Sequence, residues 1–210
     1  MRLVTIGYGN RSLEAFLALL KRNGIDVVCD VRSNPYSARY TSYNREALHG
    51  TLKAMRAKYV FMGDLLGARP SDPGLYVNGR ASYEAMARSS SFRSGIERLE
   101  SGMKAYRITL MCAEKDPIDC HRAILIAPVL RNIGTQVEHI AANGKIEADD
   151  ELRQRLLVRF GLTQEVLFES KASQDVLREA YQRRGDELAY DIAAAYRSRS
   201  AVEAVHDRIH

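Results

Sequence analysis

The sequence is poor in cysteine and contains no tryptophan. Its 210 residues include three cysteines and five prolines. An odd number of cysteines without framework spacing excludes a small disulfide-bonded scaffold and is typical of a reducing compartment. The chain also lacks a run of ~20 apolar residues, and its N-terminus lacks the apolar segment of a signal peptide. We therefore expect a cytoplasmic protein with no membrane partner.

The sequence has only a small excess of positive charge, but this excess is concentrated in the N-terminal part of the chain. The formal net charge is +5, and residues 1–60 hold ten Lys and Arg against four Asp and Glu. A basic region favours an anionic partner, either a small molecule or a nucleic acid. The charge alone fits a mildly basic globular protein equally well. The length and the 46% apolar content are ordinary for one well-buried domain.

A polar stretch separates two apolar segments within residues 106–131. Residues 107–111 have the composition of a strand buried on both faces. Asp116-Pro117 breaks this run, and Asp119 is placed to cap the helix whose apolar spacing follows. Ligands bind at the carboxyl ends of strands in open α/β sheets, so this junction predicts an active or binding site. It gathers five chemically useful side chains: Cys112, Glu114, Cys120, His121 and Arg122.

The N-terminus predicts a strand, a glycine turn and a helix, which together form half of a βαβ unit. Residues 3–7 are the strand, Ser12 caps the helix, and Gly24 ends it. The turn Gly7-Tyr8-Gly9-Asn10 departs from the dinucleotide fingerprint G-x-G-x-x-G. It is either a plain tight turn or a small backbone nest for a phosphate group.

Charged residues follow the second predicted strand, residues 25–31. Its continuous apolar run suggests parallel pairing with the first strand. Asp30 and Arg32 alternate with Val31 and should share one face. They form either one ion pair or a base and an anion clamp over a substrate. We favour the second, because charges beside a buried strand rarely serve stability alone.

Residues 33–45 are irregular and interleave three tyrosines with two arginines. Such loops can stack bases and contact phosphates, which makes a nucleic-acid-binding or processing module the alternative function. The other interpretation is a surface loop whose tyrosines cover the edge of the core.

The predicted fold is a three-layer α/β domain at residues 1–146 with a helical C-terminal extension at 147–210, packed on it or partly ordered. We expect a long loop at 68–80 and a helical stretch at 83–100 that breaks near Ser89. Residues 179–197 could pack on the domain, form a dimer contact or be partly ordered, but their frequent charge favours a solvated helix. The sheet should have about five mainly parallel strands, at residues 3–7, 25–31, 58–62, 106–112 and 135–141.

Three motifs carry a resemblance to a known family. The chain has T-I-G-x-x-N at Thr5–Asn10, D-V-R-x-x-P at Asp30–Pro35, and C-x-E…C-H-R from Cys112 to Arg122. Together they resemble the uncharacterised family called domain of unknown function 488, over roughly residues 3–145. The resemblance indicates which proteins are related to this chain, but it does not imply a particular reaction.

The junction suits thiol, acid–base or metal chemistry. Thiolates are favoured beside cationic groups, as at Cys120. Glu114 suits an acid or base, and Arg122 suits bidentate anion binding. Cys112, Cys120 and His121 could hold zinc, but the adjacent Cys120-His121 pair is awkward for one ion and no C-x-x-C pair exists. We therefore predict no metal ligands and name no cofactor. A structural interpretation also stands, with buried cysteines and charged side chains that tie the loop down.

We predict a protein that binds or acts on a phosphate-bearing or nucleotide-like ligand at residues 110–122, and leave open whether it is an enzyme. The candidate residues should line one concave surface at the carboxyl edge of the sheet, with Asn10 at its rim. Candidate reacting residues are Cys112, Glu114, Cys120, His121 and Asp30. Candidate ligand-binding residues are Arg32, Arg122, Asn10, Gly7, Ser33 and Tyr36.

Overall fold

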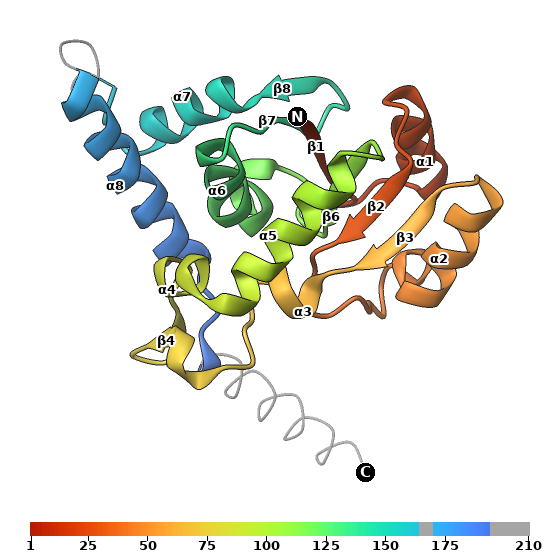
Figure 1. Ribbon diagram of the computed structural model, residues 1–210, viewed down its shortest axis with the longest axis horizontal. Coiled ribbons are helices and arrows are strands. Elements are labelled where there is room, and N and C mark those ends of the chain that lie inside the picture. The colour runs from red at the N-terminus through yellow and green to blue at the C-terminus, as the bar shows by residue number, and fades with distance from the viewer. Residues whose placement is uncertain (164–169, 194–210) are drawn as a thin grey trace, which may run out of the picture.

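The computed structural model describes residues 1–163 and 170–193, in which a six-stranded sheet has the order β3-β2-β6-β1-β7-β8 (Figure 1). The first five strands in this order are parallel, and β8 runs antiparallel to β7. This confirms the α/β class and the mainly parallel sheet. The strands are β1 (Arg2–Gly7), β2 (Val27–Asp30), β3 (Lys58–Phe61), β6 (Ile108–Cys112), β7 (Gln136–Ile140) and β8 (Ile146–Ala148).

Helices cover both faces of the sheet. On one face, α1 (Leu13–Arg22) and α2 (Arg45–Ala54) bury their apolar residues against Val4, Ile6 and Val28. On the other face, α5 (Ser90–Met103) and α6 (Ala127–Asn132) pack against the alternate strand residues, such as Leu3 and Leu110. Successive side chains of a strand point to opposite faces, so continuous apolar strands give two cores.

Local signals in the sequence fix several helix ends as expected. Ser12 accepts a hydrogen bond from the Ala15 amide and caps α1. Gly24 follows that helix with a φ of +61°, a conformation that favours glycine. Ser89 separates α4 (Tyr83–Arg88) from α5 and caps α5 through the Phe92 amide, which confirms the predicted break.

The segment expected as a long loop contains regular structure. After α3 (Gly63–Leu66), the 3₁₀ turn η2 (Pro73–Leu75) leads into a hairpin of β4 (Tyr76–Val77) and β5 (Arg80–Ala81). Asn78 and Gly79 join its strands, both with positive φ. Asn-Gly is the favoured pair for a two-residue hairpin turn, so the sequence held this signal.

The sheet differs from the prediction at two places. The second strand does not pair with the first, because β6 lies between β1 and β2. In addition, β8 adds a sixth strand, whose three residues are too few to show a strand pattern in the sequence. Strand order is a long-range property, and apolar strands buried on both faces resemble one another in sequence.

The C-terminal helices pack on the segment that follows β6. After α7 (Asp149–Arg159), α8 (Ser170–Leu188) buries Val176, Ala180 and Arg184, four residues apart. The first two join a cluster with Ile118 and Leu156. This corrects the expected solvated helix, of which residues 194–197 lie outside the described residues. The division at residue 146 stays a prediction, and the extension's residues 164–169 and 194–210 also lie outside the described part.

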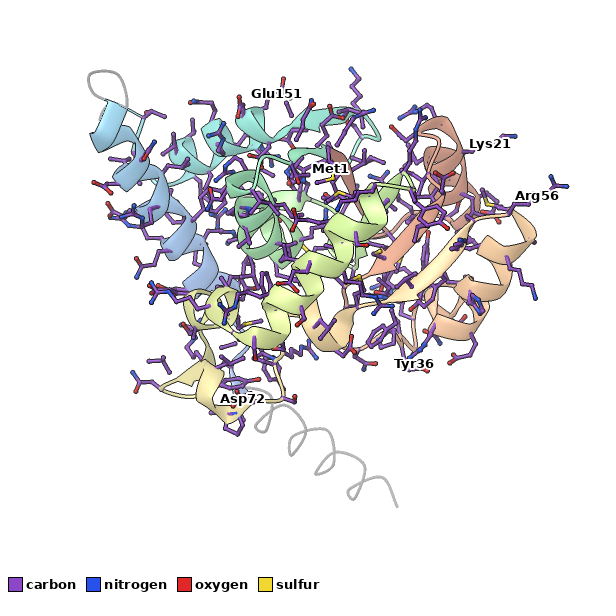
Figure 2. The ribbon with its side chains drawn as sticks, viewed as in Figure 1. Met1, Lys21, Tyr36, Arg56, Asp72 and Glu151 are labelled. Atoms are coloured by element: carbon purple, nitrogen blue, oxygen red, sulfur yellow. The ribbon has the colours of Figure 1, made fainter. Side chains whose placement is uncertain are left out.

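Within the described residues, every helix is too short or too polar to cross a bilayer. Charged side chains such as those of Lys21, Arg56 and Glu151 project from the periphery (Figure 2).

Candidate functional site: a thiol and arginine junction at the carboxyl edge of the sheet

The chain makes two unusual turns after β6. Asp116 caps the 3₁₀ helix η3 (Pro117–Asp119) by accepting the Ile118 amide at 3.1 Å. Cys120 is extended, and the π-helix η4 (Arg122–Ile126) then leads into α6. Asp119 therefore does not cap the helix as expected, and its carboxylate pairs with Arg184 of α8 instead. Single π turns are rare and frequently occur at functional sites.

These turns bring two thiols and an imidazole together. Cys112, Cys120 and His121 are 3%, 1% and 6% exposed. His121 Nδ1 lies 3.8 Å from each sulfur atom. Its Nε2 lies 3.1 Å from the Val31 carbonyl, which can only accept a hydrogen bond. The proton therefore sits on Nε2, and Nδ1 is directed at the thiols.

Glu114 connects this buried cluster to the surface. The residue as a whole is exposed, but its Oε2 lies 2.9 Å from Cys120 Sγ. Glu114 thus has exposed surface while its carboxylate oxygen reaches back to the buried Cys120 thiol.

The pKa values in the cluster move in different directions. The hydrogen bond to Cys120 and burial raise the pKa of Cys112. Burial opposes a charged Cys120, but the Cys112 thiol and the Arg122 and His121 cations lower its pKa. Burial and Cys120 raise the pKa of Glu114, and Cys120 raises that of His121 against the effect of burial. Of the two thiols in the cluster, Cys120 is therefore the one that ionises more readily.

Arg122 has the largest fully buried side chain among the residues that the structure describes, and some of its hydrogen-bond donors are unused. Its Nη1 donates to the Glu114 carbonyl at 2.9 Å. Its Nε and Nη2 have no hydrogen-bond partner among the described residues. A buried guanidinium with free N–H groups is costly unless an acceptor is supplied.

Gly7 lets β1 approach this arginine closely. A Cβ atom at Gly7 would lie 1.7 Å from the Glu114 carbonyl oxygen and 3.0 Å from Arg122 Nη2. Gly7 is thus a packing position between strand and loop, which favours the plain-turn interpretation over the phosphate nest.

Asp30 and Arg32 form a closed ion pair. Arg32 donates through Nε and Nη2 to the two carboxylate oxygens at 2.9 and 2.6 Å. The Tyr59 hydroxyl and the Arg32 amide also donate to Asp30. These contacts favour the ion-pair alternative, because the carboxylate has little capacity left to act as a base. Arg32 Nη1 is buried without a partner among the described residues, and the guanidinium lies 5.3 Å from the centre of the Tyr8 ring.

The expected single surface is in fact two groups on opposite faces of the sheet. Asp30 is opposite Met111 in the register of β2 and β6. Met111 belongs to the core beneath α1 and α2, whereas Cys112 belongs to the core beneath α5 and α6. Neighbouring residues of a strand alternate between faces, so Asp30 and Cys112 diverge. The groups meet at the strand ends, where Arg32, Cys112 and Glu114 all influence the pKa of Tyr8.

The remaining candidates lie in the surrounding loops. Asn10 is exposed beyond β1. Ser33 Oγ accepts the Arg69 amide at 2.9 Å and so joins two loops. Tyr36 is half exposed on the outside of the molecule, and its hydroxyl donates to Glu46 at 2.8 Å (Figure 2). Tyr43, in contrast, is buried and stacked on Tyr8 with ring centres 4.3 Å apart.

Three neighbours of the site were not singled out from the sequence. Tyr8 stands at a variable position of the first motif. Arg11 donates to the Gly7 and Ala141 carbonyls and lies close enough to Arg122 for mutual repulsion to lower the Arg11 pKa, after the larger effect of burial. Tyr83 of α4 is partly buried and lies near the thiols. Only long-range packing brings Tyr83 there, so no local signal marks it.

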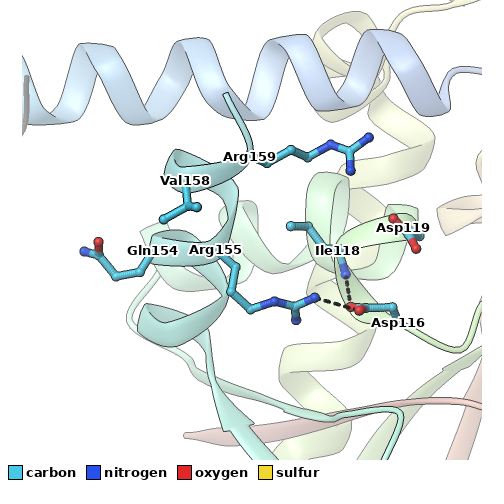
Figure 3. Close-up of a pocket in the computed structure, with 7 residues that line it drawn as sticks. All are labelled: Asp116, Ile118, Asp119, Gln154, Arg155, Val158 and Arg159. Atoms are coloured by element: carbon cyan, nitrogen blue, oxygen red, sulfur yellow. Dashed lines mark hydrogen bonds and ion pairs between the residues drawn. The ribbon is translucent and has the colours of Figure 1, made fainter. Parts of the chain in front are cut away.

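A separate open pocket of about 630 Å³ lies between α7 and the 116–119 turn (Figure 3). Arg155 pairs there with Asp116 at 2.6 Å and with Glu147 at 2.7 Å. Its charged groups thus neutralise one another, and the pocket does not reach the thiols.

The fold and this junction define a class: a three-layer α/β protein with a buried thiol and arginine cluster at the carboxyl edge of its sheet. The chain belongs to the family described as Domain of unknown function DUF488, whose model matches residues 12–128. The match includes the second and third motifs and begins after the first. Comparison with curated proteins and with solved structures finds no match.

Proposed function

We propose that the protein binds a phosphate-bearing, nucleotide-like anion at the strand–loop–helix segment 110–122. The observation that carries the proposal is the Arg122 guanidinium, which is fully buried and uses one of its three nitrogen atoms. Burying a cation with free donors is costly. A phosphate group offers paired oxygens that match the guanidinium fork.

The neighbouring groups give the site its further chemistry. Arg11 adds a second cation beside Arg122. Glu114 is the carboxylate in contact with Cys120, and in this proposal it exchanges a proton with the bound ligand. Cys112, Cys120 and His121 are the reacting groups on the buried side, if the ligand is turned over.

The other candidates take supporting roles in this proposal. Asp30 acts through Arg32, which it orients, and is a positioning residue. Asn10 is the exposed residue at the rim. Gly7, Ser33 and Tyr36 are occupied by packing or by loop contacts, so ligand binding does not require them.

A nucleic-acid module is the weaker alternative. Of the three loop tyrosines, Tyr43 is stacked on Tyr8 in the core, and the Tyr36 hydroxyl donates a hydrogen bond to Glu46. Tyr43 is therefore not available to stack on a base. The two functions differ in their response to salt. Counterion release makes nucleic-acid binding fall steeply with ionic strength, whereas a buried anion site responds less.

The test measures binding of inorganic phosphate, AMP, ATP and single-stranded RNA to the full chain by calorimetry at two salt concentrations. We expect phosphate-bearing small molecules to bind the wild type, Arg122→Lys to bind them more weakly, and Arg122→Ala to lose them. Arg131→Ala is the matched control, because Arg131 is a partly buried arginine paired with Asp149 away from the thiols. Equal binding by wild type and Arg122→Ala overturns the proposal, as does binding of RNA alone with a steep dependence on salt.

A further inference from the structure

The thiol cluster has the dimensions of a metal site. The donor atoms of Cys112, Cys120 and His121 all lie within 4.8 Å of one another, and Nδ1 is 3.8 Å from each sulfur. Zinc binds thiolate at about 2.3 Å and imidazole at about 2.0 Å, so tetrahedral S and N donors stand about 3.5 Å apart. The two N–S distances would therefore shorten by a few tenths of an ångström around one ion, and the sulfur–sulfur distance, which is within 4.8 Å, would close to about 3.8 Å.

The histidine ring is already oriented as a metal ligand requires. The Val31 carbonyl accepts a hydrogen bond from Nε2, and this directs Nδ1, which carries the lone pair of the neutral ring, at both sulfurs. Metal-binding histidines almost always donate their other ring N–H to a carbonyl or carboxylate in this manner. The hydrogen bond thus orients the ring for a ligand role without contacting the metal position.

The backbone removes the objection that the sequence raised. Adjacent residues such as Cys120 and His121 usually project apart. Here Cys120 is extended, with φ −139° and ψ 140°, and His121 is helical, with φ −58° and ψ −24°. This change of conformation between neighbours lets both side chains face Cys112 of β6.

The surroundings suit a soft cation held by two thiolates. All three donors are buried, and Arg122 influences both thiols electrostatically and so offsets part of their negative charge. The Glu114 carboxylate contacts Cys120 but lies outside the three-donor group. These three donors leave one position of a tetrahedral ion without a protein ligand, and three protein ligands with an open position are the pattern of catalytic zinc sites.

We propose that Cys112, Cys120 and His121 bind one Zn²⁺ ion whose fourth position opens beside Glu114. On binding, the two thiols lose their protons to solvent and the thiolates and Nδ1 each donate an electron pair to the metal. The inference is independent of anion binding. With an ion bound, Arg122 and Glu114 remain available to a ligand.

The test begins with the full chain stripped by a chelator and then titrated with Zn²⁺ or Co²⁺. We expect one ion per chain by elemental analysis, together with the thiolate charge-transfer band and intense visible bands of tetrahedral cobalt. Cys112→Ser and His121→Gln should each lower metal affinity by at least ~10-fold. Cys29→Ser is the matched control, because Cys29 is equally buried on β2 but belongs to no donor group among the described residues.

Two readouts keep the proposal open to refutation if a variant folds poorly. Circular dichroism shows whether each variant is folded. In the wild type, Zn²⁺ should slow the alkylation of Cys112 and Cys120 and leave the alkylation rate of Cys29 unchanged. The proposal fails if wild type takes up no stoichiometric metal, if cobalt gives only a pale octahedral spectrum, or if folded Cys112→Ser binds normally. Repeating the phosphate titration on metal-free protein separates the two proposals, since phosphate binding that survives leaves anion binding intact.

Discussion

At the residue scale, Gly7 and Arg122 occupy contacting positions, and each limits what the other accepts. Position 7 requires glycine because a Cβ there would lie 1.7 Å from the Glu114 carbonyl oxygen, a backbone atom that cannot rotate away as a side chain could. The buried guanidinium group of Arg122 lies beside the same position, because its Nη2 would be 3.0 Å from that Cβ atom. The motif residue therefore serves the site indirectly, by letting β1, the loop and the arginine meet.

We predict that Gly7→Ala lowers the free energy of unfolding by about 3 kcal/mol or more, because overpacking displaces the strand or the loop. Gly50→Ala is the matched control. A Cβ at Gly50 meets no atom within 4 Å, and the position lies in α2. That change should stabilise the protein by up to about 1 kcal/mol. Urea unfolding measures both, and equal stability of the two variants would refute the packing argument.

At the element scale, α8 holds the turn that precedes Cys120. Arg184 is 6% exposed and donates from Nε to the Ile118 carbonyl at 2.9 Å, while its other nitrogens pair with Asp119 and Glu187. A helix distant in sequence thus fixes η3, from which the chain enters the thiol cluster.

We predict that Arg184→Ala costs about 2 kcal/mol of unfolding free energy, because the Ile118 carbonyl loses its buried donor. The amides of residues 118–120 should also exchange hydrogen faster. Arg183→Ala serves as control, since Arg183 pairs with Glu179 on the exposed side of α8 and should cost no more than about 0.5 kcal/mol. Unchanged exchange at residues 118–120 in Arg184→Ala would show that α8 does not restrain the turn.

At the scale of the whole molecule, a second buried network joins the sheet to the C-terminal helices. His139 of β7 lies 2.8 Å from Thr5 of β1 and 3.4 Å from Asp149 at the start of α7. Asp149 also pairs with Arg131 of α6 at 2.7 Å. The network connects β1, β7, α6 and α7, so its charge state affects global stability.

This network predicts a loss of stability in acid. Burial opposes ionisation of Asp149, but His139 and Arg131 outweigh it and hold its pKa below the usual value. A carboxyl group with a lowered folded-state pKa contributes stability that is fully present above its unfolded pKa of about 3.9 and is lost as the pH falls through the folded value. Asp149→Asn should therefore lower stability at neutral pH and flatten its decline below about pH 4.

Urea unfolding from about pH 7 to about pH 3 measures this dependence. Glu84→Gln is the control, because the Glu84 carboxylate pairs with Arg88 on the exposed surface. This substitution should change neither the stability at neutral pH nor its decline in acid. If Asp149→Asn follows the wild-type decline in parallel, other carboxyl groups cause the acid sensitivity.

The sequence by itself determined the elements and the chemical groups. The five parallel strands, the Ser12 cap and the break at Ser89 follow from local periodicity and capping. These signals act over one turn of helix or a few residues of strand, so they survive whatever the chain does elsewhere. The junction after β6 was recognisable for the same reason, because its cysteines, histidine and arginine lie within eleven residues.

Only the tertiary structure decided which groups face one another. Placing β6 between β1 and β2 sets Asp30 opposite Met111 and sends Asp30 and Cys112 to different faces. A shift of the register by one residue would reverse this, since side chains alternate along each strand. The contacts of Tyr83 and Arg184 with the junction likewise join distant segments. Such pairings depend on how the whole chain packs, and local residue patterns do not encode them.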